Sequence, residues 1–535
     1  MNKTSKMKTK NPDGNFIARY FKFSDRQTTF KKEMLGGLIT FLAMAYILAV
    51  QPGMMDTLNY KYPGSMPMGG VFLATVISSF VATMIMGLLA NVPLSLAPGM
   101  GINAFFVFTV CIVLGIDPYD AMATVLVSGW LYFIIAITPA RKYISKAVPK
   151  NLKIAIGAGI GFFLAFMGLQ DAGIIQSDAS MMTAKDGSHS VISATSVKLG
   201  DFANPVVIVA IVVIFLMFIL HFMKVKAGII ISMILGIVLM AILYGAGVKG
   251  FSSAFKMKSY SEEFGGFSKI AGKGWTHLGS MFKNPLSYIA IFVFLYTDFF
   301  DTTGTLFVIG EASGINEREG DKWMTKANIA DATGTVFGAS VGASTVTSFV
   351  ESTTGTAAGA RTGFASVVTA FLFLASMALW PIMSPLMPVT NEFTHAGAVT
   401  TPTLKPITAP VLILVGSLMM MQLKEFNWKE MIDVPALFLT ILITMLTYSI
   451  SAGMAAGIIV FVILNSIAGL RQYIDIKRGK PMFTVGDEGE IITSDIKGKT
   501  GVETKTNYWK RLNIPLLIMF VLAMVYFGTT VLYMY

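Results

Sequence analysis

The segment APGMGIN, residues 97–103, interrupts an apolar run that covers residues 95–116. It holds one proline and two glycines, which are poor residues for a helix interior. The run itself is long enough to cross the roughly 30 Å hydrocarbon layer of a membrane. Irregular backbone at that depth is tolerated only where it is buried in protein or lines a cavity. The sequence therefore predicts a membrane segment that begins with a short extended piece.

The segment GASTVTS, residues 342–348, has the same character about 250 residues later, at the start of another apolar run. It is rich in hydroxyl-bearing and β-branched side chains, which also disfavour a helix. The apolar runs that begin near residues 34 and 285 are separated by the same offset. Matched broken segments in two halves of a chain are the best pointer in a sequence to a transport site.

Apolar runs recur from one end of the chain to the other. Of its 535 residues, 54% are hydrophobic and 13% are charged, whereas soluble domains are about 25% charged. We interpret fourteen runs as membrane spans, and they lie at 34–55, 70–90, 95–116, 121–138, 152–173, 204–223, 226–247, 285–309, 326–342, 344–358, 362–386, 407–423, 433–450 and 453–470. Because seven spans per half is an odd number, the two halves enter the membrane in opposite senses. The expected fold class is an all-α polytopic membrane protein of fourteen transmembrane segments in two inverted seven-segment repeats.

The expected organisation of the chain follows from these runs. It consists of a cytoplasmic tail at 1–33, a first repeat at 34–250, an extracellular loop at 251–284, a second repeat at 285–470, a cytoplasmic segment at 471–513, and an apolar run at 514–535 that is long enough for an additional transmembrane helix. The two interrupted segments fall in the third and tenth spans, one in each repeat.

Lys and Arg gather in the N-terminal tail and in the gaps after the fourth, sixth, eighth, twelfth and fourteenth spans. This distribution predicts a multi-pass plasma-membrane protein with a cytoplasmic N-terminus. The loop at 248–284 is rich in lysine although it falls outside, but long loops follow the rule poorly. The net charge of +11 is therefore interpreted as topology control, and nucleic acid is not expected as a partner.

Two carboxylates lie deep in the span at 285–309. Asp298 and Asp301 are three residues apart, so they share one helical face. Each costs about 2.5–3.5 kcal/mol at the centre of a membrane helix. No Lys or Arg lies in the middle of a predicted span to pair with them, which favours a functional role over a structural ion pair. Thr302, next to Asp301, joins them as a candidate substrate-binding residue.

The two interrupted segments supply the other candidate binding residues. Glu351 follows the extended piece of the tenth span and precedes a short helix, where helix capping is the structural alternative. Asn103 offers two donors and an acceptor in the third span, where an interhelical hydrogen bond is the alternative. Phe105 can stack on a flat ring, although most aromatic side chains in such a chain face lipid or core.

A serine enzyme is the alternative from another class. The segment GASVG, residues 338–342, fits the nucleophile-elbow pattern G-x-S-x-G. An intramembrane serine hydrolase needs a base, however, and no histidine is well placed: His189, His277 and His395 fall in loops, and His221 falls at the end of a span. The single cysteine, Cys111, excludes an intrachain disulfide and a cysteine metal site. The sequence lacks a Walker loop, and neither a cofactor nor a metal is expected.

Five separated motifs resemble one known family. They are TFLAMAYI at 40–47, APGMGINAFF at 97–106, GIGFFLAFMGLQDAGI at 159–174, FFDTTGTL at 299–306 and TVTSFVESTTGTAAGARTG at 345–363. In this order they resemble the azaguanine-like (AzgA) purine permeases, which belong to the nucleobase–cation symporter group with the uracil and xanthine permeases. The resemblance implies fourteen spans, a core domain and a gate domain. It also implies proton-coupled uptake of adenine, guanine or hypoxanthine, and a homodimer, because relatives often dimerise.

The resemblance also implies roles for particular residues. An acidic residue of the eighth span, Asp301 or Asp298, and Glu351 of the tenth span would bind the base and handle the proton. We prefer Asp301, because Asp301-x-x-Gly304 resembles the spacing in some relatives. Gly101 and Asn103 match the element of the third span.

Chemistry agrees with this assignment. The N–H groups of a purine donate to a carboxylate with charge-assisted strength. A desolvated carboxylate also has reason to hold a proton. The remaining alternative, an anion exchanger of the same architecture, would use the positive ends of half-helices, but Asp298, Asp301 and Glu351 argue against it. We therefore expect segments 95–106 and 344–356 to lie side by side, with Asn103, Glu351 and Asp301 around one cavity.

Overall fold

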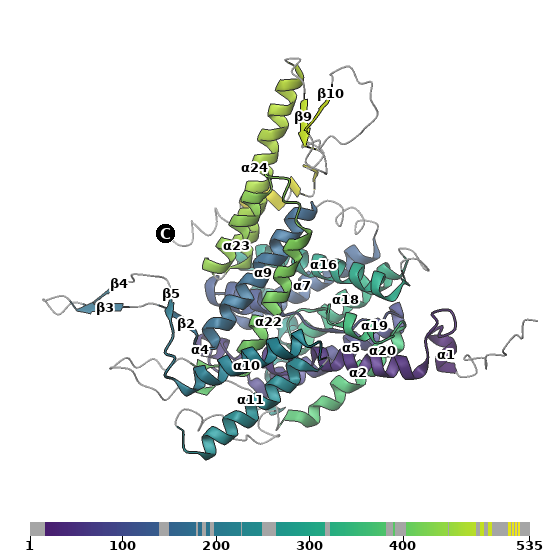
Figure 1. The fold of residues 1–535 in the computed structure, drawn as a ribbon, viewed down its shortest axis with the longest axis vertical. Coiled ribbons are helices and arrows are strands. Elements are labelled where there is room, and N and C mark those ends of the chain that lie inside the picture. The colour runs from purple at the N-terminus through teal and green to yellow at the C-terminus, as the bar shows by residue number, and fades with distance from the viewer. Residues whose placement is uncertain are drawn as a thin grey trace, which may run out of the picture. The chain divides into compact units, whose positions relative to one another are not determined.

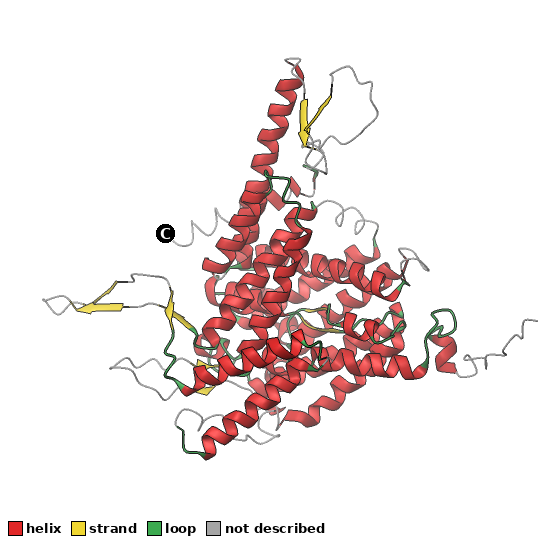
Figure 2. Ribbon diagram, viewed as in Figure 1, coloured by secondary structure: helices red, strands yellow, loops and turns green. Residues whose placement is uncertain are grey.

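The computed structural model describes residues 16–138, 149–177, 180–183, 189–192, 197–225, 227–248, 264–315, 322–380, 389–390, 403–447, 449–477, 482–485, 491–494 and parts of 512–524. Most of these residues are helical, and the strands are short (Figure 2). The predicted tail up to residue 15, the basic gap at 139–148 and the end of the run at 514–535 lie outside the described residues. Their predicted topology stays a prediction.

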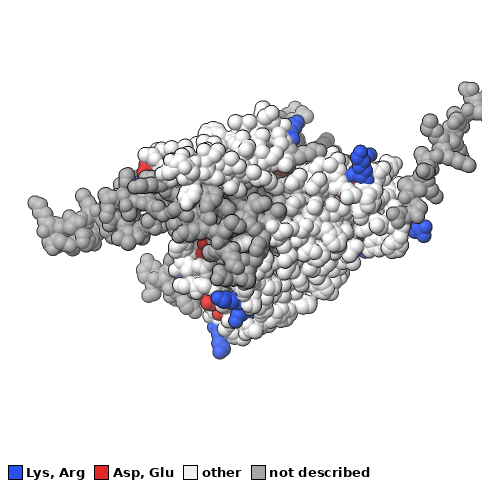
Figure 3. Space-filling view, turned by 90° about the horizontal axis from the view of Figure 1, so that it is seen from below, with Lys and Arg blue, Asp and Glu red and all other residues white. Residues whose placement is uncertain are grey.

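Eight of the helices in the described part are long and apolar enough to cross a membrane, and they lie at Phe30–Lys61, Met68–Ala90, Pro118–Ile137, Lys150–Asp171, Pro205–Phe222, Gly228–Gly245, Pro285–Leu306 and Ala452–Arg471. Shorter apolar helices lie at Met100–Val113, Gly363–Ala378 and Val434–Thr447. Charged side chains are sparse on the face drawn in Figure 3, most of whose described surface is uncharged. The chain is therefore a multi-pass membrane protein, as its composition predicted.

The chain folds as two compact units. The first comprises Met1–Val107, Gly115–Ile137 and Met167–Leu414, and the second comprises Phe108–Leu114, Thr138–Phe166 and Val415–Tyr535. Both units therefore draw on both halves of the sequence.

The helices of the first unit carry most of the predicted site. They are α1 (Phe16–Tyr20), α2 (Phe30–Met44), α3 (Ile47–Met55), α4 (Leu58–Lys61), α5 (Met68–Ile85) with a π-helical end at Met86–Ala90, α6 (Met100–Ala104), α7 (Pro118–Ile137), α10 (Pro205–Phe222), α11 (Gly228–Gly245), α13 (Phe267–Ile270), α14 (Lys273–Thr276), α15 (Leu278–Met281), α16 (Pro285–Ser313), α18 (Lys322–Val341), α19 (Ser352–Ala357) and α20 (Gly363–Ala375) with a 3₁₀ turn at Ser376–Leu379. Helix α18 packs on α5 and α7, α20 packs on α2 and α5, and α16 packs on α7 and α19. Helices α10 and α11 lie side by side (Figure 1).

The core of the first unit contains two short strands from distant parts of the sequence. Strands β1 (Leu96–Pro98) and β6 (Val346–Ser348) pair antiparallel, with Ala97 opposite Thr347. Helices α6 and α19 begin shortly after them. This confirms the prediction that the segments 95–106 and 344–356 contain extended pieces that lie side by side.

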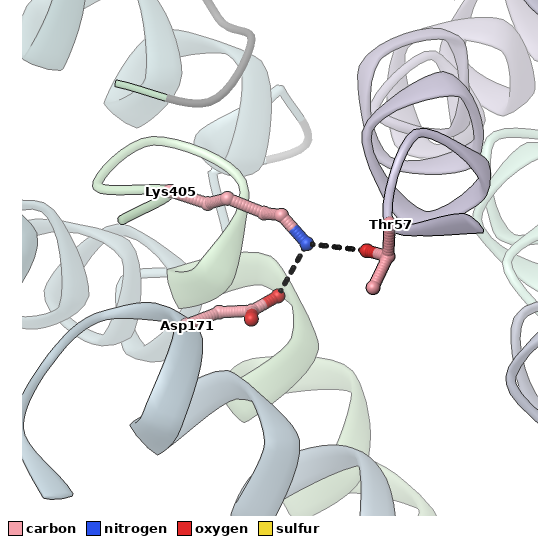
Figure 4. Close-up of polar contacts among 3 residues, drawn as sticks. All are labelled: Thr57, Asp171 and Lys405. Carbon is pink, nitrogen blue, oxygen red and sulfur yellow. Dashed lines mark hydrogen bonds and ion pairs between the residues drawn. The ribbon is translucent and has the colours of Figure 1, made fainter. Parts of the chain in front are cut away.

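The remaining strands of the first unit lie in its loops. They form three further antiparallel pairs, β2 (Ile175–Ser177) with β5 (Val197–Leu199), β3 (Ser180–Thr183) with β4 (His189–Ile192), and β7 (Val389–Thr390) with β8 (Thr403–Leu404). A partly buried ion pair lies beside β8, where Lys405 Nζ is 3.0 Å from Asp171 Oδ2 and 3.3 Å from Thr57 Oγ1 (Figure 4).

The second unit contains two complete long helices and parts of other helical segments. Helices α23 (Val434–Thr447) and α24 (Ile450–Lys477) pack against each other, and α24 is followed by the strand pair β9 (Met482–Val485) and β10 (Ile491–Ser494). Helix α9 (Lys150–Asp171) begins in the second unit and ends in the first, whereas α22 (Ala409–Met420) and a π-helical segment at Phe105–Val113 begin in the first unit and end in the second. A 3₁₀ turn at Met421–Glu425 extends α22, and Lys150 pairs with Glu425 at 3.0 Å.

The N-terminal residues before the first span are folded rather than extended, at least from residue 16. Helix α2 begins at Phe30, with Thr29 as its N-cap, so the span starts before the predicted residue 34. The rings of Phe21 and Phe23 pack against Phe364 of α20, at centroid distances of 5.5 and 5.9 Å. The predicted tail at 1–33 therefore includes a segment that contributes to the core.

Candidate functional site

The candidate site is built around the β1–β6 pair, whose backbone groups are satisfied by neighbouring hydroxyls. Thr83 Oγ1 on α5 exchanges hydrogen bonds with both backbone polar groups of Leu96, at 2.9 Å each. Thr335 Oγ1 on α18 donates to the Val346 carbonyl at 2.8 Å. Since no lipid can satisfy a backbone group at this depth, these side chains allow the helices to be interrupted here. The interrupted backbone is therefore a stable feature of the core.

Asp301 and Thr302 are adjacent on α16 but have different surroundings. The Asp301 side chain is exposed, and its Oδ2 accepts a long hydrogen bond of 3.4 Å from Thr347 Oγ1. Thr302 is fully buried, and its hydroxyl donates to Asp331 Oδ2 at 2.7 Å. Asp301 is therefore accessible to a solute, whereas Thr302 is turned into the protein.

Asp298 lies one helical turn before Asp301 and is buried. Its Oδ2 lies 2.8 Å from Thr335 Oγ1 on α18, so the single hydrogen of this hydroxyl is shared between Asp298 and the Val346 carbonyl. Its Oδ1 has no hydrogen-bond partner among the described residues. The two aspartates, predicted to share a helical face, thus differ in exposure and in partners.

Glu351 lies at the start of α19, where it is half-buried. Its Oε1 accepts a 2.8 Å hydrogen bond from the Tyr46 hydroxyl. Its side chain makes no capping hydrogen bond to α19. The capping alternative left open by the sequence is therefore not supported, because the carboxylate is engaged by a side chain of the first span.

Asn103 is fully buried on α6 and takes part in a row of amide groups. Its Nδ2 donates to Gln51 Oε1 at 2.5 Å, and Gln51 Nε2 donates to the Ala343 carbonyl at 3.2 Å. The Oδ1 atom of Asn103 has no partner among the described residues. The interhelical hydrogen bond considered as an alternative for Asn103 is therefore present, and the remaining acceptor stays free for another group.

The two other candidates of the third segment lie near Asn103. Gly101 on α6 is half-buried. Phe105 is 1% exposed, and its ring packs edge-on against Phe294 of α16 at 4.8 Å. In this structure Phe105 is therefore a core aromatic, and its stacking on a substrate stays a prediction.

Three residues of the site were missed by the sequence reasoning. Asp331 on α18 is fully buried and accepts hydrogen bonds on both oxygens, from Thr302 and from Ser348 Oγ at 2.8 Å. Gln51 and Tyr46 on the first span hold Asn103 and Glu351. A carboxylate inside the predicted span at 326–342 was the signal available for Asp331, and it is the same signal that identified Asp298.

The segment GASVG, residues 338–342, has a structural explanation. Ser340 Oγ donates to the carbonyl of Val336 on its own helix at 2.7 Å and accepts from Trp275 Nε1 at 2.9 Å. A Cβ atom on Gly338 would lie 2.5 Å from Val346 Cγ2 of β6, so this glycine permits close packing of α18 on the strand pair. The pattern therefore reflects packing rather than a nucleophile elbow.

Apolar membrane-spanning helices around a cluster of buried and accessible carboxylates define a membrane transport protein as the class of this chain. No grouping of His, Cys, Asp and Glu within the described residues has the arrangement of a metal site. The carboxylates, hydroxyls and amides offer hydrogen bonds to a small polar solute.

Comparison with known proteins identifies the family. A family model described as "Permease family" matches residues 31–456, and the chain belongs to this family. The guanine/hypoxanthine permease PbuO of Bacillus subtilis is 35% identical over 451 residues, covering 84% of this chain and 94% of that protein. The adenine permease AdeQ of Escherichia coli is 29% identical over 454 residues, covering 85% of this chain and 91% of that protein. The resemblance found in the sequence is confirmed.

Among solved structures, the transmembrane domain of the cyanobacterial bicarbonate transporter BicA is similar, with a TM-score of 0.49 and 14% identity, covering 80% of this chain and 97% of that chain. The matching family model and the relative PbuO are permeases, so the chain is a permease and not an enzyme, and the serine hydrolase alternative was wrong.

Proposed function

We propose that this permease takes up purine bases through the plasma membrane by proton symport. Two accessible carboxylates carry the proposal: Asp301 is exposed and Glu351 is half-buried, in a chain whose relatives include guanine, hypoxanthine and adenine permeases. Helix α16, which bears Asp301, packs on β6 and on α19, which follows Glu351 directly. The two carboxylates thus flank the end of the strand pair.

Each residue of the site receives a proposed role. Asp301 and Glu351 accept hydrogen bonds from purine N–H groups, because a charged acceptor makes such a bond about twice as strong as a neutral one. Asn103 Oδ1 is a further acceptor, and Gly101 allows close approach of the base. Phe105 lines the site from behind, and Thr302 acts through its neighbours Asp301 and Asp331. Glu351, Asp298 and Asp301 are the proposed proton-handling groups.

The proposed architecture is fourteen spans in two inverted repeats, with a core domain that moves against a gate domain and with the N-terminus in the cytoplasm. The antiparallel pairing of β1 with β6 supports the inverted repeat, because a two-fold axis in the membrane plane would relate the third and tenth segments in this way. A homodimer is part of the proposal and rests on the family resemblance alone.

Uptake by proteoliposomes tests this function. Purified protein in liposomes should accumulate labelled hypoxanthine when an inward proton gradient is imposed, and a protonophore should abolish the accumulation. Absence of uptake with and without the gradient would refute a purine permease. Uptake that equilibrates but never responds to the gradient would leave a purine permease and refute the symport.

The preferred base can be found in the same assay. A competition series with adenine, guanine, hypoxanthine, xanthine and uracil against labelled hypoxanthine ranks these bases by how strongly each competes for the site. Bicarbonate and chloride belong in the series, because competition by either would favour the anion exchanger instead.

A further inference from the structure

Two carboxylates on different helices are connected by two hydroxyl groups. Thr302 Oγ1 donates to Asp331 Oδ2 at 2.7 Å and lies 3.0 Å from Thr347 Oγ1. Thr347 Oγ1 also reaches Asp301 Oδ2, at 3.4 Å. We call the row Asp301–Thr347–Thr302–Asp331 the hydroxyl relay.

The hydroxyl relay leads from an accessible group to a fully buried one. Asp301 is exposed, Thr347 is 2% exposed, and Thr302 and Asp331 are fully buried. Both oxygens of Asp331 accept hydrogen bonds from hydroxyls, the second from Ser348, as suits an ionised carboxylate. Among the described residues, Asp331 is hydrogen-bonded by side-chain hydroxyls, and a carboxylate buried in this way is a poor place for a substrate and a good place for a proton.

We propose that the hydroxyl relay carries the coupled proton between Asp301 and Asp331, and that Asp331 holds this proton while a purine is bound. The inference rests on the proposed function. It assigns the proton to a residue that does not itself contact the base, so that the proton and the purine do not compete for one carboxylate.

The transfer is balanced in atoms and charge. At the start, a proton from solvent is on Asp301 Oδ2, and the Thr347 and Thr302 hydrogens point toward ionised Asp331. The Asp301 proton moves to Thr347 Oγ1, the Thr347 proton moves to Thr302 Oγ1, and the Thr302 proton moves to Asp331 Oδ2. Three O–H bonds break and three form, and the negative charge passes from Asp331 to Asp301.

This transfer gives a physical reason for coupling. Once the proton is on Asp331, Asp301 is an ionised acceptor that two groups can use: the Thr347 hydroxyl and a purine N–H. A purine that binds ionised Asp301 therefore stabilises the state with the proton on Asp331, and by linkage the stored proton strengthens purine binding to the same extent. The purine and the stored proton leave together when the site opens to the opposite side of the membrane.

Other titratable groups face the relay. Asp298 on α16 and Tyr132 on α7 interact with Asp331, and Glu351 interacts with Asp301. Asp298 is hydrogen-bonded to Thr335, which lies outside the relay, and it also interacts with Thr347 and Asp301 of the relay. Glu351 is hydrogen-bonded to Tyr46. Because interacting carboxylates titrate together, the test has to follow transport rather than the titration of one group.

Two transport measurements test the hydroxyl relay. Proteoliposomes report uptake of labelled hypoxanthine driven by an inward proton gradient, and they report exchange of labelled for unlabelled hypoxanthine without a gradient. Thr302→Val removes the hydroxyl at constant shape and should lower the ratio of driven uptake to exchange by about a hundredfold or more, the lower end of what one positioned proton-transfer group contributes. Thr302→Ser should restore the ratio. Asp331→Asn should abolish the response to the gradient while exchange persists.

Thr75→Val is the matched control, because Thr75 is a buried threonine whose hydroxyl bonds only the Val71 carbonyl on its own helix in the described contacts. A wild-type ratio in Thr302→Val would overturn the relay and leave the proposed function standing. Equal losses of uptake and exchange, unrescued by serine, would also overturn the relay and indicate a structural role. A wild-type protein without purine uptake would overturn the relay together with the proposed function.

Discussion

The carboxylate of Glu351 is held by a side chain rather than by its own helix. Tyr46 reaches it from a break between α2 and α3, where two turn residues interrupt the long apolar helix of the first span. This contact positions the charge beside the strand pair. The proposed binding role of Glu351 and the proposed orienting role of Tyr46 can therefore be tested by separate substitutions.

Replacing Glu351 with Gln keeps the shape of the side chain and removes its charge. Transport should be lost, with hypoxanthine binding damaged less than transport if Glu351 mainly handles the proton. Uptake by proteoliposomes and binding by the detergent-solubilised protein measure the two effects. Wild-type transport by Glu351→Gln would contradict the assignment.

Replacing Tyr46 with Phe removes the hydrogen bond to Glu351 and leaves the ring. A hydrogen bond to a charged group contributes about 1.5–3 kcal/mol, so the KM for hypoxanthine should rise by roughly tenfold or more. The control is Tyr288→Phe, since Tyr288 is 53% exposed and its hydroxyl donates to the Phe282 carbonyl. Equal KM values in the two variants would show that Tyr46 does not orient Glu351.

The sequence predicted the acidic residues of the site better than their partners. Asp298, Asp301 and Glu351 stand out because a charge inside an apolar run is costly. The burial of Asp298 and the exposure of Asp301 depend on how α16 is turned against α18, which no local pattern specifies. Asp331 also places a charge inside an apolar run, so the sequence could have identified it in the same way. The contacts of Gln51 and Tyr46, in contrast, depend on tertiary packing.

At the scale of elements, the sequence predicted that the two segments of the strand pair are extended, but it did not predict which residues lie opposite each other. Proline and glycine at 97–101 and β-branched residues at 345–347 both reject a helix, so extended backbone follows from local chemistry. The alignment of Ala97 with Thr347 is set by the packing of α5 and α18 around the pair. Local sequence carries no information on that packing.

Gly99, just after β1, is a position in the strand pair where a small change has a large effect. A Cβ atom there would collide with Thr347 Cγ2, the side chain that contacts Asp301. Gly99→Ala should destabilise the protein by about 1–3 kcal/mol, as overpacking does, and should lower the melting temperature in detergent. Gly53→Ala is the control, because a Cβ on Gly53 in α3 meets nothing within 4 Å. An unchanged melting temperature for Gly99→Ala would show that the strand pair yields easily.

The ion pair beside β8 makes a second stability prediction. The Lys405 and Asp171 side chains are 10% and 19% exposed, so removing one partner leaves a poorly solvated charge. Lys405→Ala and Asp171→Ala should each destabilise the protein by about 1–3 kcal/mol. The double variant should lose less than the sum of the single losses, because the contact is shared. Additive losses in melting temperature would show that the pair contributes no coupling.

At the scale of the whole molecule, hydropathy predicted a multi-pass helical protein, and the structure agrees. The resemblance implied a core domain and a gate domain, but no local pattern in the sequence indicates that each of the two observed units is assembled from both halves of the chain. The sequence also did not predict that Phe21 and Phe23, before the first span, pack on Phe364. Both features depend on contacts between residues hundreds of positions apart.

The single cysteine makes the proposed topology testable. Cys111 is fully buried and should not react with a membrane-impermeant thiol reagent. Lys283→Cys lies in the proposed external loop and should be labelled from outside intact cells, whereas Lys224→Cys lies in a proposed cytoplasmic gap and should be labelled only after lysis. Both lysines are exposed. Labelling of both positions from outside would refute the proposed orientation of the spans.

The β1–β6 pair also has an evolutionary consequence. Its strands are joined through main-chain groups, which every residue except proline supplies in full. Side chains on the pair that do not themselves keep the backbone extended can therefore change while the pairing persists. A family built on such a frame can diversify its choice of cargo by point substitution without rebuilding the fold.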